Sequence, residues 1–166
     1  MQRLTAALVL MAFGSAAAAQ QAQRAEVFGA WAVYVSDEPR ACIAFATASE
    51  EIGWPADSTG AASQMLVTWR ENVAGQVTFR AGGHAVAAGS ALALTAAEVR
   101  IPMFTDGDWA WTADPADDIR AIEALGRTET AGVSLVAEGA VPVIVTFALD
   151  GFADAAARAA MLCAGA

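Results

Sequence analysis

The stretch TDGDWAWTADPADDIRAIEALG, residues 105–126, contains a strand end, a tight turn, a second strand and a helix start in quick succession. Asp106-Gly107 favours a short hairpin turn, and the two tryptophans that follow share one face of the returning strand. Asp114 can cap the free amides of a helix, and Pro115 suits the first helical position. The stretch therefore predicts a β-hairpin followed by a helix over about 115–125, ended by Gly126.

The segments on either side of this stretch are mostly predicted strands separated by turns. Their alternation of apolar and polar residues predicts strands over 25–35, 42–47, 64–69, 76–80, 91–95, 98–104, 133–138 and 141–149. Residues 49–63 are rich in small and acidic residues and predict a long surface loop. Residues 152–163 predict a second helix. The fold class expected is mainly β: a single-domain β-sandwich or partly open barrel with two peripheral helices, at about 115–125 and 152–163.

The first nineteen residues have the three parts of a secretory signal peptide. Arg3 gives the positive start, residues 4–13 form a short apolar run, and Ala17-Ala18-Ala19 is a small-residue cleavage site. Cleavage is expected after Ala19, which leaves 20–166 as one domain. The apolar run is shorter than the roughly 20 residues that a spanning helix needs, and no second run reaches that length. The sequence predicts a periplasmic or secreted protein with no integral membrane segment after cleavage.

The charge composition excludes several classes of function. The chain has 18 acidic residues, 9 arginines and no lysine, for a net charge of −9. A nucleic-acid backbone would be repelled, so no nucleic-acid partner is expected. Without lysine there is no Schiff-base chemistry and no phosphate-loop lysine. The one histidine, His84, rules out a multi-histidine zinc site and is expected to be a surface or packing residue. No cofactor or metal is predicted.

Two cysteines, Cys42 and Cys163, are predicted to form a disulfide, because exported compartments are oxidising. Cys163 falls on one helical face with Phe152, Ala156 and Ala159, which places it toward the core. The bond would tie the last helix to an early strand. It would also remove the only thiols of the chain from the possible nucleophiles.

The acidic residues around the central turn are the best candidate for a ligand site. Asp106 and Asp108 belong to a cluster with Asp114, Asp117 and Asp118. Such carboxylates can bind calcium or perform acid–base work on a sugar. Turn, cap and helix-dipole roles account locally for all of them except Asp108. The spacing does not match the twelve-residue calcium loop, so this site is kept as the alternative hypothesis.

Five tryptophans offer possible contact surfaces. Most are expected to be core residues, because their strand positions alternate with small or polar residues. Trp54 is the exception, since it lies beside Pro55 in the long loop. An exposed aromatic ring in a loop is a candidate contact for a partner. The only tyrosine, Tyr34, is expected to pack on a strand face.

Several of these motifs together resemble the invasion-associated locus B family of proteins exported by Gram-negative bacteria. Residues 28–33, FGAWAV, are similar to the Phe-Gly-Asp-Trp strand that opens the family, with Ala30 where aspartate is usual. Cys42 stands at the first family cysteine. Residues 105–111 with 115–118 are similar to a later segment of one subgroup. Leu149-Asp150-Gly151-Phe152, followed by a helix ending near Cys163, resembles the C-terminal signature. The likeness covers nearly all of the mature chain.

The resemblance implies an all-β exported domain with peripheral helices, in a family of which some members are linked to host-cell invasion. It implies no enzyme activity. The leading hypothesis is therefore a non-enzymatic envelope protein that binds a protein or envelope partner. The alternative is a calcium- or sugar-binding protein, or a hydrolase, that uses the cluster of residues 106–118. A third possibility is a passive stability or assembly factor. The identity of the partner and the oligomeric state stay open.

Overall fold

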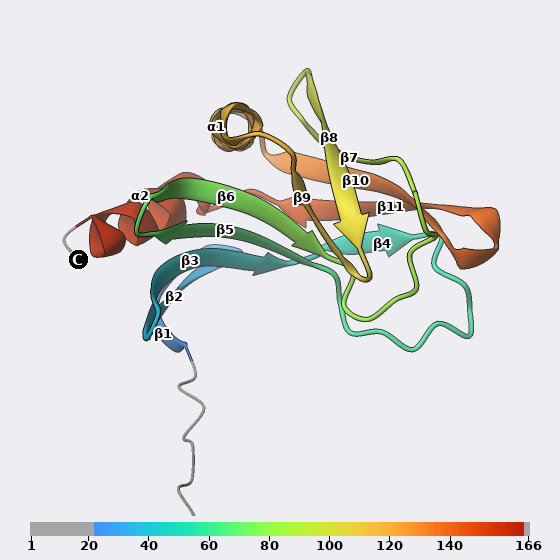
Figure 1. The fold of residues 1–166 in the computed structure, drawn as a ribbon, viewed down its shortest axis with the longest axis horizontal. Helices are drawn as coiled ribbons and strands as arrows, with labels where there is room; N and C mark the ends of the chain where they lie inside the picture. The colour runs from blue at the N-terminus through green and yellow to red at the C-terminus, as the bar shows by residue number, and fades with distance from the viewer. Residues whose placement is uncertain (1–21, 165–166) are drawn as a thin grey trace, which may run out of the picture.

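The computed structural model describes residues 22–164, so the predicted signal peptide, residues 1–19, lies outside the described residues. Eleven strands form one antiparallel sheet that does not close, in the order β1-β2-β3-β5-β6-β9-β8-β7-β10-β11-β4 (Figure 1). The elements are β1 (Gln23–Phe28), β2 (Trp31–Asp37), β3 (Arg40–Thr47), β4 (Glu50–Ile52), β5 (Gln64–Arg70), β6 (Val73–Arg80), β7 (Leu92–Ala96), β8 (Val99–Asp106), β9 (Trp109–Thr112), α1 (Pro115–Leu125), β10 (Thr130–Ala137), the 3₁₀ turn η1 (Glu138–Ala140), β11 (Val141–Ala148) and α2 (Phe152–Cys163). This confirms the predicted fold class and the bounds of both helices.

The sheet curls so that its two halves bury a shared core. Phe79 on β6 meets Phe147 on β11 edge to face, with ring centroids 6.3 Å apart, and both side chains are buried. Alternate residues along each strand enter this core because the side-chain period of a strand is two. The start of β2 is tied to the end of β11, since the Trp31 indole donates to the Ala148 carbonyl at 3.0 Å. This hydrogen bond therefore holds together two strands that are far apart in the sequence.

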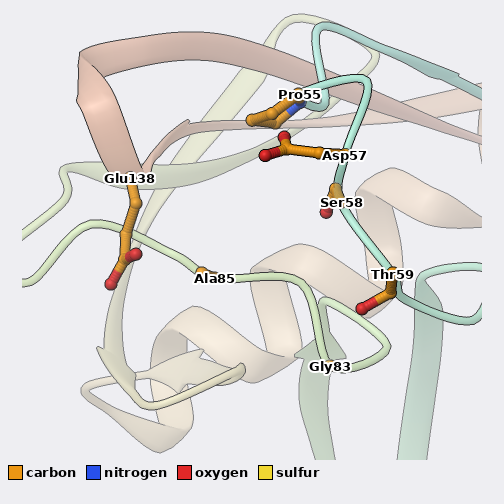
Figure 2. Close-up of a pocket in the computed structure, with 7 residues that line it drawn as sticks. All are labelled: Pro55, Asp57, Ser58, Thr59, Gly83, Ala85 and Glu138. Atoms are coloured by element: carbon orange, nitrogen blue, oxygen red, sulfur yellow. The ribbon is translucent and has the colours of Figure 1, made fainter.

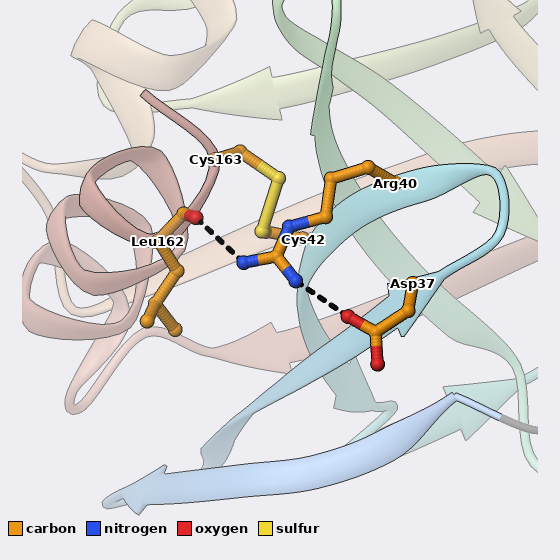
Figure 3. A network of polar contacts seen from close by, with 5 residues as sticks. All are labelled: Asp37, Arg40, Cys42, Leu162 and Cys163. Atoms are coloured by element: carbon orange, nitrogen blue, oxygen red, sulfur yellow. Dashed lines mark hydrogen bonds and ion pairs between the residues drawn. A yellow bond between two sulfur atoms is a disulfide. The ribbon is translucent and has the colours of Figure 1, made fainter. Parts of the chain in front are cut away.

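Helix α2 packs on β1, β2, β3 and β5 and is joined to the sheet by a disulfide. Cys42 on β3 is bonded to Cys163, with their Cα atoms 5.8 Å apart, as the sequence predicts. Figure 3 shows Arg40 beside this bond, pairing with Asp37 and donating to the Leu162 carbonyl at 3.1 Å. The end of α2 is thus held by one covalent bond and one charged hydrogen bond.

Helix α1 packs on β6, β7, β8 and β9 through a polar contact as well as an apolar face. Its Asp118 side chain is buried and accepts hydrogen bonds from the Val77 amide at 2.7 Å and the Thr112 hydroxyl at 2.8 Å. Burial raises the pKa of Asp118 above its ordinary value, these two hydrogen bonds oppose the rise, and Asp117 and Asp114 add to it. The sequence assigns Asp118 only a helix-dipole role, so its burial is a finding of the structure.

Most of the predicted strand ends differ from the observed ones by one to three residues, and two larger differences stand out. The expected strand 25–35 is two strands, because Gly29 and Ala30 form a turn in which Gly29 has a φ of +53°. A Cβ at Gly29 would collide with the Asp150 carboxylate, so distant contacts select glycine there. The expected loop 49–63 also contains the short strand β4, which pairs with β11. Among the helices of residues 22–164, none has the length and apolar character to cross a membrane.

Candidate binding site

A polar cavity of about 410 Å³ lies between the loop after β4 and two neighbouring connections. Figure 2 shows its wall: the loop faces the segment before β7, and η1 closes one side. The lining residues are Pro55, Asp57, Ser58, Thr59, Gly83, Ala85 and Glu138. Loops of this length are often functional when a scaffold holds them in place. We call this cavity the loop pocket.

Glu51 on β4 fixes both ends of the pocket loop. Its carboxylate accepts hydrogen bonds from the Trp54 indole and from the Ser63 amide, the latter at 2.6 Å. The Ser63 hydroxyl donates to the same carboxylate at 3.3 Å, and Ser63 is fully buried. Hydrogen bonds to an ionised acceptor are stronger than neutral ones. The loop is therefore held at its base by one carboxylate.

His84 lies between two lining residues of the loop pocket, Gly83 and Ala85, and packs against the loop. Its imidazole is nine-tenths buried and stacks on the Trp54 indole, with centroids 4.3 Å apart and the planes 13° from parallel. The Ser58 hydroxyl contacts its Nδ1. A Cβ at Gly60 would collide with the imidazole, so the backbone approaches the ring closely. His84 is a packing residue, one of the two roles that the sequence predicts for it.

The contact between Ser58 and His84 raises the question of nucleophilic chemistry. A Ser-His-Asp triad needs an acid that hydrogen-bonds the second ring nitrogen and orients the imidazole. Within residues 22–164, His84 has no carboxylate in that position. The contact between Ser58 and His84 instead links the pocket loop to the connection between β6 and β7.

Trp54 is less exposed than the sequence predicts, and its role as a partner contact stays a prediction. Its side chain is half-buried, packs against the hydrophobic core and is covered on one face by His84. The residues that reach the pocket are instead its neighbours Asp57, Ser58 and Thr59. Composition predicts the loop, but only the structure shows that the indole turns inward.

In the structure the members of the predicted acidic cluster have different surroundings. Asp108 accepts hydrogen bonds from the Arg80 guanidinium at 3.1 Å and from the Gly83 amide at 3.0 Å, while Asp106 is exposed at the end of β8. Asp114 caps α1, Asp117 pairs with Arg120, and Asp118 is buried. Across the part of the chain that the structure describes, no three His, Cys, Asp or Glu residues are placed to share a metal ion.

The loop pocket presents oxygen acceptors to a ligand. The Asp57 and Glu138 carboxylates come from different connections, and the Ser58 and Thr59 hydroxyls follow Asp57 along the loop (Figure 2). Carboxylates and hydroxyls accept hydrogen bonds from ammonium, guanidinium and hydroxyl groups. Asp57 and Glu138 are 81 positions apart, and no spacing pattern in the sequence brings them together. The pocket suits a positively charged or hydroxyl-rich group.

Fold and pocket together define a small open-sheet β domain with a braced polar cavity at its surface. Comparison of the chain with protein-family models, with curated proteins and with solved structures finds no match. The likeness to the invasion-associated locus B family therefore rests on the short motifs in the sequence.

Proposed function

We propose that the chain is an exported, non-enzymatic envelope protein of the invasion-associated locus B type that binds a protein or envelope partner at the loop pocket. The observation that carries this proposal is the bracing of an open polar cavity. Glu51 holds the base of the loop, and the stacking of Trp54 on His84 ties the loop to the connection that carries Gly83 and Ala85. Binding to a preformed site costs less conformational entropy than binding to a mobile loop. A role in host interaction follows only from the family resemblance.

The charge of the pocket supports a partner with basic or hydroxyl groups. Asp57 and Glu138 line it from two sides, and the whole chain carries a net charge of −9. A negative field speeds the encounter with a positively charged partner and repels phosphate-rich ones. A protein surface with arginine or lysine side chains fits these features.

Site-specific crosslinking in the native host tests the proposal. A photoreactive residue at Thr59, which lines the pocket, is expected to trap a partner, whereas one at exposed Glu71 on the far β5–β6 turn is not. The double variant Asp57→Asn/Glu138→Gln should abolish trapping from position 59. A matched control with the same charge change, Glu71→Gln/Glu98→Gln, should not, because both residues are exposed and lie outside the pocket lining.

Equal trapping from positions 59 and 71, or trapping that the pocket variant leaves unchanged, would contradict the proposal. A melting temperature that rises with calcium or with an envelope glycan, and no longer does so after Asp106→Asn/Asp108→Asn, would support the carboxylate-based alternative instead.

A further inference from the structure

Two cross-strand rows of side chains cover the outer face of β6, β9 and β8. In the first row Arg80 is paired with Trp109, and Trp109 with Asp106. Residues paired directly across antiparallel strands point to the same side. Their sequence neighbours Phe79 and Ala110 enter the core, so this row faces outward. Trp109 thus lies between a cationic and an anionic side chain.

The second row lies next to the first and consists of Thr78, Trp111 and Phe104. Phe104 meets Trp111 edge to face, with ring centroids 4.5 Å apart. Phe104 is 44% exposed and Trp109 is 38% exposed. The sequence predicts that most tryptophans are core residues, and this is wrong for Trp109. We call the six residues of the two rows the aromatic strip.

The charged ends of the first row have spare hydrogen-bonding capacity. The guanidinium carbon of Arg80 lies 5.0 Å from the centre of the Trp109 ring, and its Nε donates to Asp108. Within residues 22–164 its two terminal nitrogens make no hydrogen bond, and Asp106 forms no ion pair. Each end of the row can therefore accept a partner of opposite charge.

This order of charges is self-complementary. A two-fold axis along β9 would lay the Trp109 side chains of two copies against each other. The same rotation carries the Arg80 side of one copy over the Asp106 side of the other, which forms two identical ion pairs. The same rotation brings the second rows of the two copies together, so that Phe104 of one copy faces Thr78 of the other. We propose that the aromatic strip is a homodimer interface whose specificity comes from two reciprocal Arg80–Asp106 pairs.

The charge pattern favours a second copy over other partners. A glycan or an extended peptide would use the aromatic rings but has no need of one cation and one anion on opposite sides of Trp109. The strip also has an apolar centre and a charged rim, as specific interfaces do. It is smaller than a standard stable interface, so the dimer is expected to be reversible and dependent on concentration.

Charge reversal at the two ends tests the geometry. The variants Arg80→Glu and Asp106→Arg each place like charges opposite each other twice in a homodimer, and each is expected to weaken dimerisation by roughly tenfold or more. An equimolar mixture of the two variants should form a heterodimer, because Arg80 then faces Asp106 and Glu at 80 faces Arg at 106. The double variant Arg80→Glu/Asp106→Arg should dimerise with itself for the same reason.

Sedimentation velocity over a concentration series up to roughly 1 mM measures the dimer, and native mass spectrometry of a size-tagged mixture detects the heterodimer. Arg127→Glu makes the same charge change in the turn after α1, a helix whose buried face joins the core on the other side of the sheet, and should leave dimerisation unchanged. Circular dichroism and the melting temperature check that Arg80→Glu still folds without its bond to Asp108.

A wild-type protein that stays monomeric over the whole series overturns the proposal and leaves the strip to a glycan or peptide. A wild-type dimer that both reversals leave intact also overturns it, as does a mixture of the variants that forms no heterodimer. The outcome is independent of the loop pocket, because its variants Asp57→Asn/Glu138→Gln change no residue of the strip.

Discussion

Helix α1 begins at signals in its own sequence, whereas helix α2 begins where distant parts of the chain meet. Asp114 accepts a hydrogen bond from the Ala116 amide at 2.7 Å, and Pro115 is the first residue of α1. At the start of α2 stands Gly151, which has a φ of +81° and provides no side-chain cap. Its position is set instead by the Phe28 carbonyl, which leaves no room for a Cβ.

The anchors of the two helices differ as well. Helix α2 is held by the Cys42–Cys163 disulfide and by Phe152, whose ring packs against Trp31 with centroids 4.8 Å apart. Helix α1 is held by the buried Asp118 carboxylate. The anchoring of α2 is therefore expected to weaken with reductant and not with acid, whereas the anchoring of α1 is expected to depend on pH and not on reductant. Five measurements test this difference between the anchors of α1 and α2.

Loss of the disulfide is expected to have the largest effect. In the chain-entropy model, a closed loop of 121 residues stabilises the fold by about 5 kcal/mol. The variant Cys42→Ala/Cys163→Ala, or reduction of the wild type, should lower the free energy of unfolding by up to that amount. Calorimetry of the oxidised and reduced protein measures the change. Equal melting temperatures would show that the packing of Phe152 holds α2 without help.

The variant Gly151→Ala should cost about 2–4 kcal/mol, because the substitution adds a strained positive φ to a backbone collision. Gly89→Ala is the matched control. Gly89 has a similar φ of +72°, but a Cβ there meets nothing within 4 Å, so the cost should be only about 1 kcal/mol. Urea denaturation of both variants separates the cost of the positive φ from the cost of the backbone collision. Equal losses would mean that the contact with Phe28 has no part in the stability of the α2 start.

The variant Asp118→Ala should destabilise the protein by about 2–3 kcal/mol, because the Val77 amide and the Thr112 hydroxyl lose their buried acceptor. Asp117→Ala is the control on the same turn, where loss of the partly exposed pair with Arg120 should cost less than about 1 kcal/mol. Chemical denaturation measures both. If the two variants are equally stable, the buried carboxylate does not anchor α1.

Removal of the helix cap should have a smaller effect. Asp114→Ala is expected to cost about 1 kcal/mol, since it leaves the Ala116 amide without its acceptor. Asp154→Ala, in the first turn of α2, removes only a favourable charge and should cost a few tenths of that amount. Thermal unfolding ranks the two. The reverse order would mean that the start of α2 depends more on its own sequence than the start of α1 does.

The dependence of the free energy of unfolding on pH tests the contribution of the Asp118 carboxyl group specifically. Its native pKa is raised above the ordinary value of 3.8, so the native state holds this proton more tightly than the unfolded chain does. The stability that comes from this proton is fully present below about pH 4 and is lost as pH rises through the native pKa. The difference in stability between wild type and Asp118→Asn should therefore change over that window. A difference that is constant with pH would contradict this.

Local signals account for the parts of the fold that the sequence predicts. A two-residue turn follows β8 as expected, although Gly107 and Asp108 form it, one residue later than the Asp106-Gly107 signal indicates. Asp114-Pro115 starts the expected helix, because turn and cap chemistry involve residues a few positions apart. The same reasoning fails at Gly29. Its turn is selected by Asp150, which lies 121 positions away along the chain.

The candidate sites show the same limit. A period of two places Trp109 and Trp111 on one face of a strand, but it does not say whether that face is buried. The composition of residues 49–63 predicts a loop, yet the inward turn of Trp54 depends on His84, which lies in another connection. Asp118 follows the pattern of a helix-dipole carboxylate, and its burial depends on β6 and β9.

The tie between the start of β2 and the end of β11 has a consequence for the order in which the chain folds. A ribosome completes residues 28–42 long before residues 148–163, yet Trp31 needs Ala148 and Cys42 needs Cys163. Contacts so far apart in sequence slow folding and cannot form on a nascent chain. The native fold of this domain is therefore expected to be completed only after nearly its last residue has been synthesised.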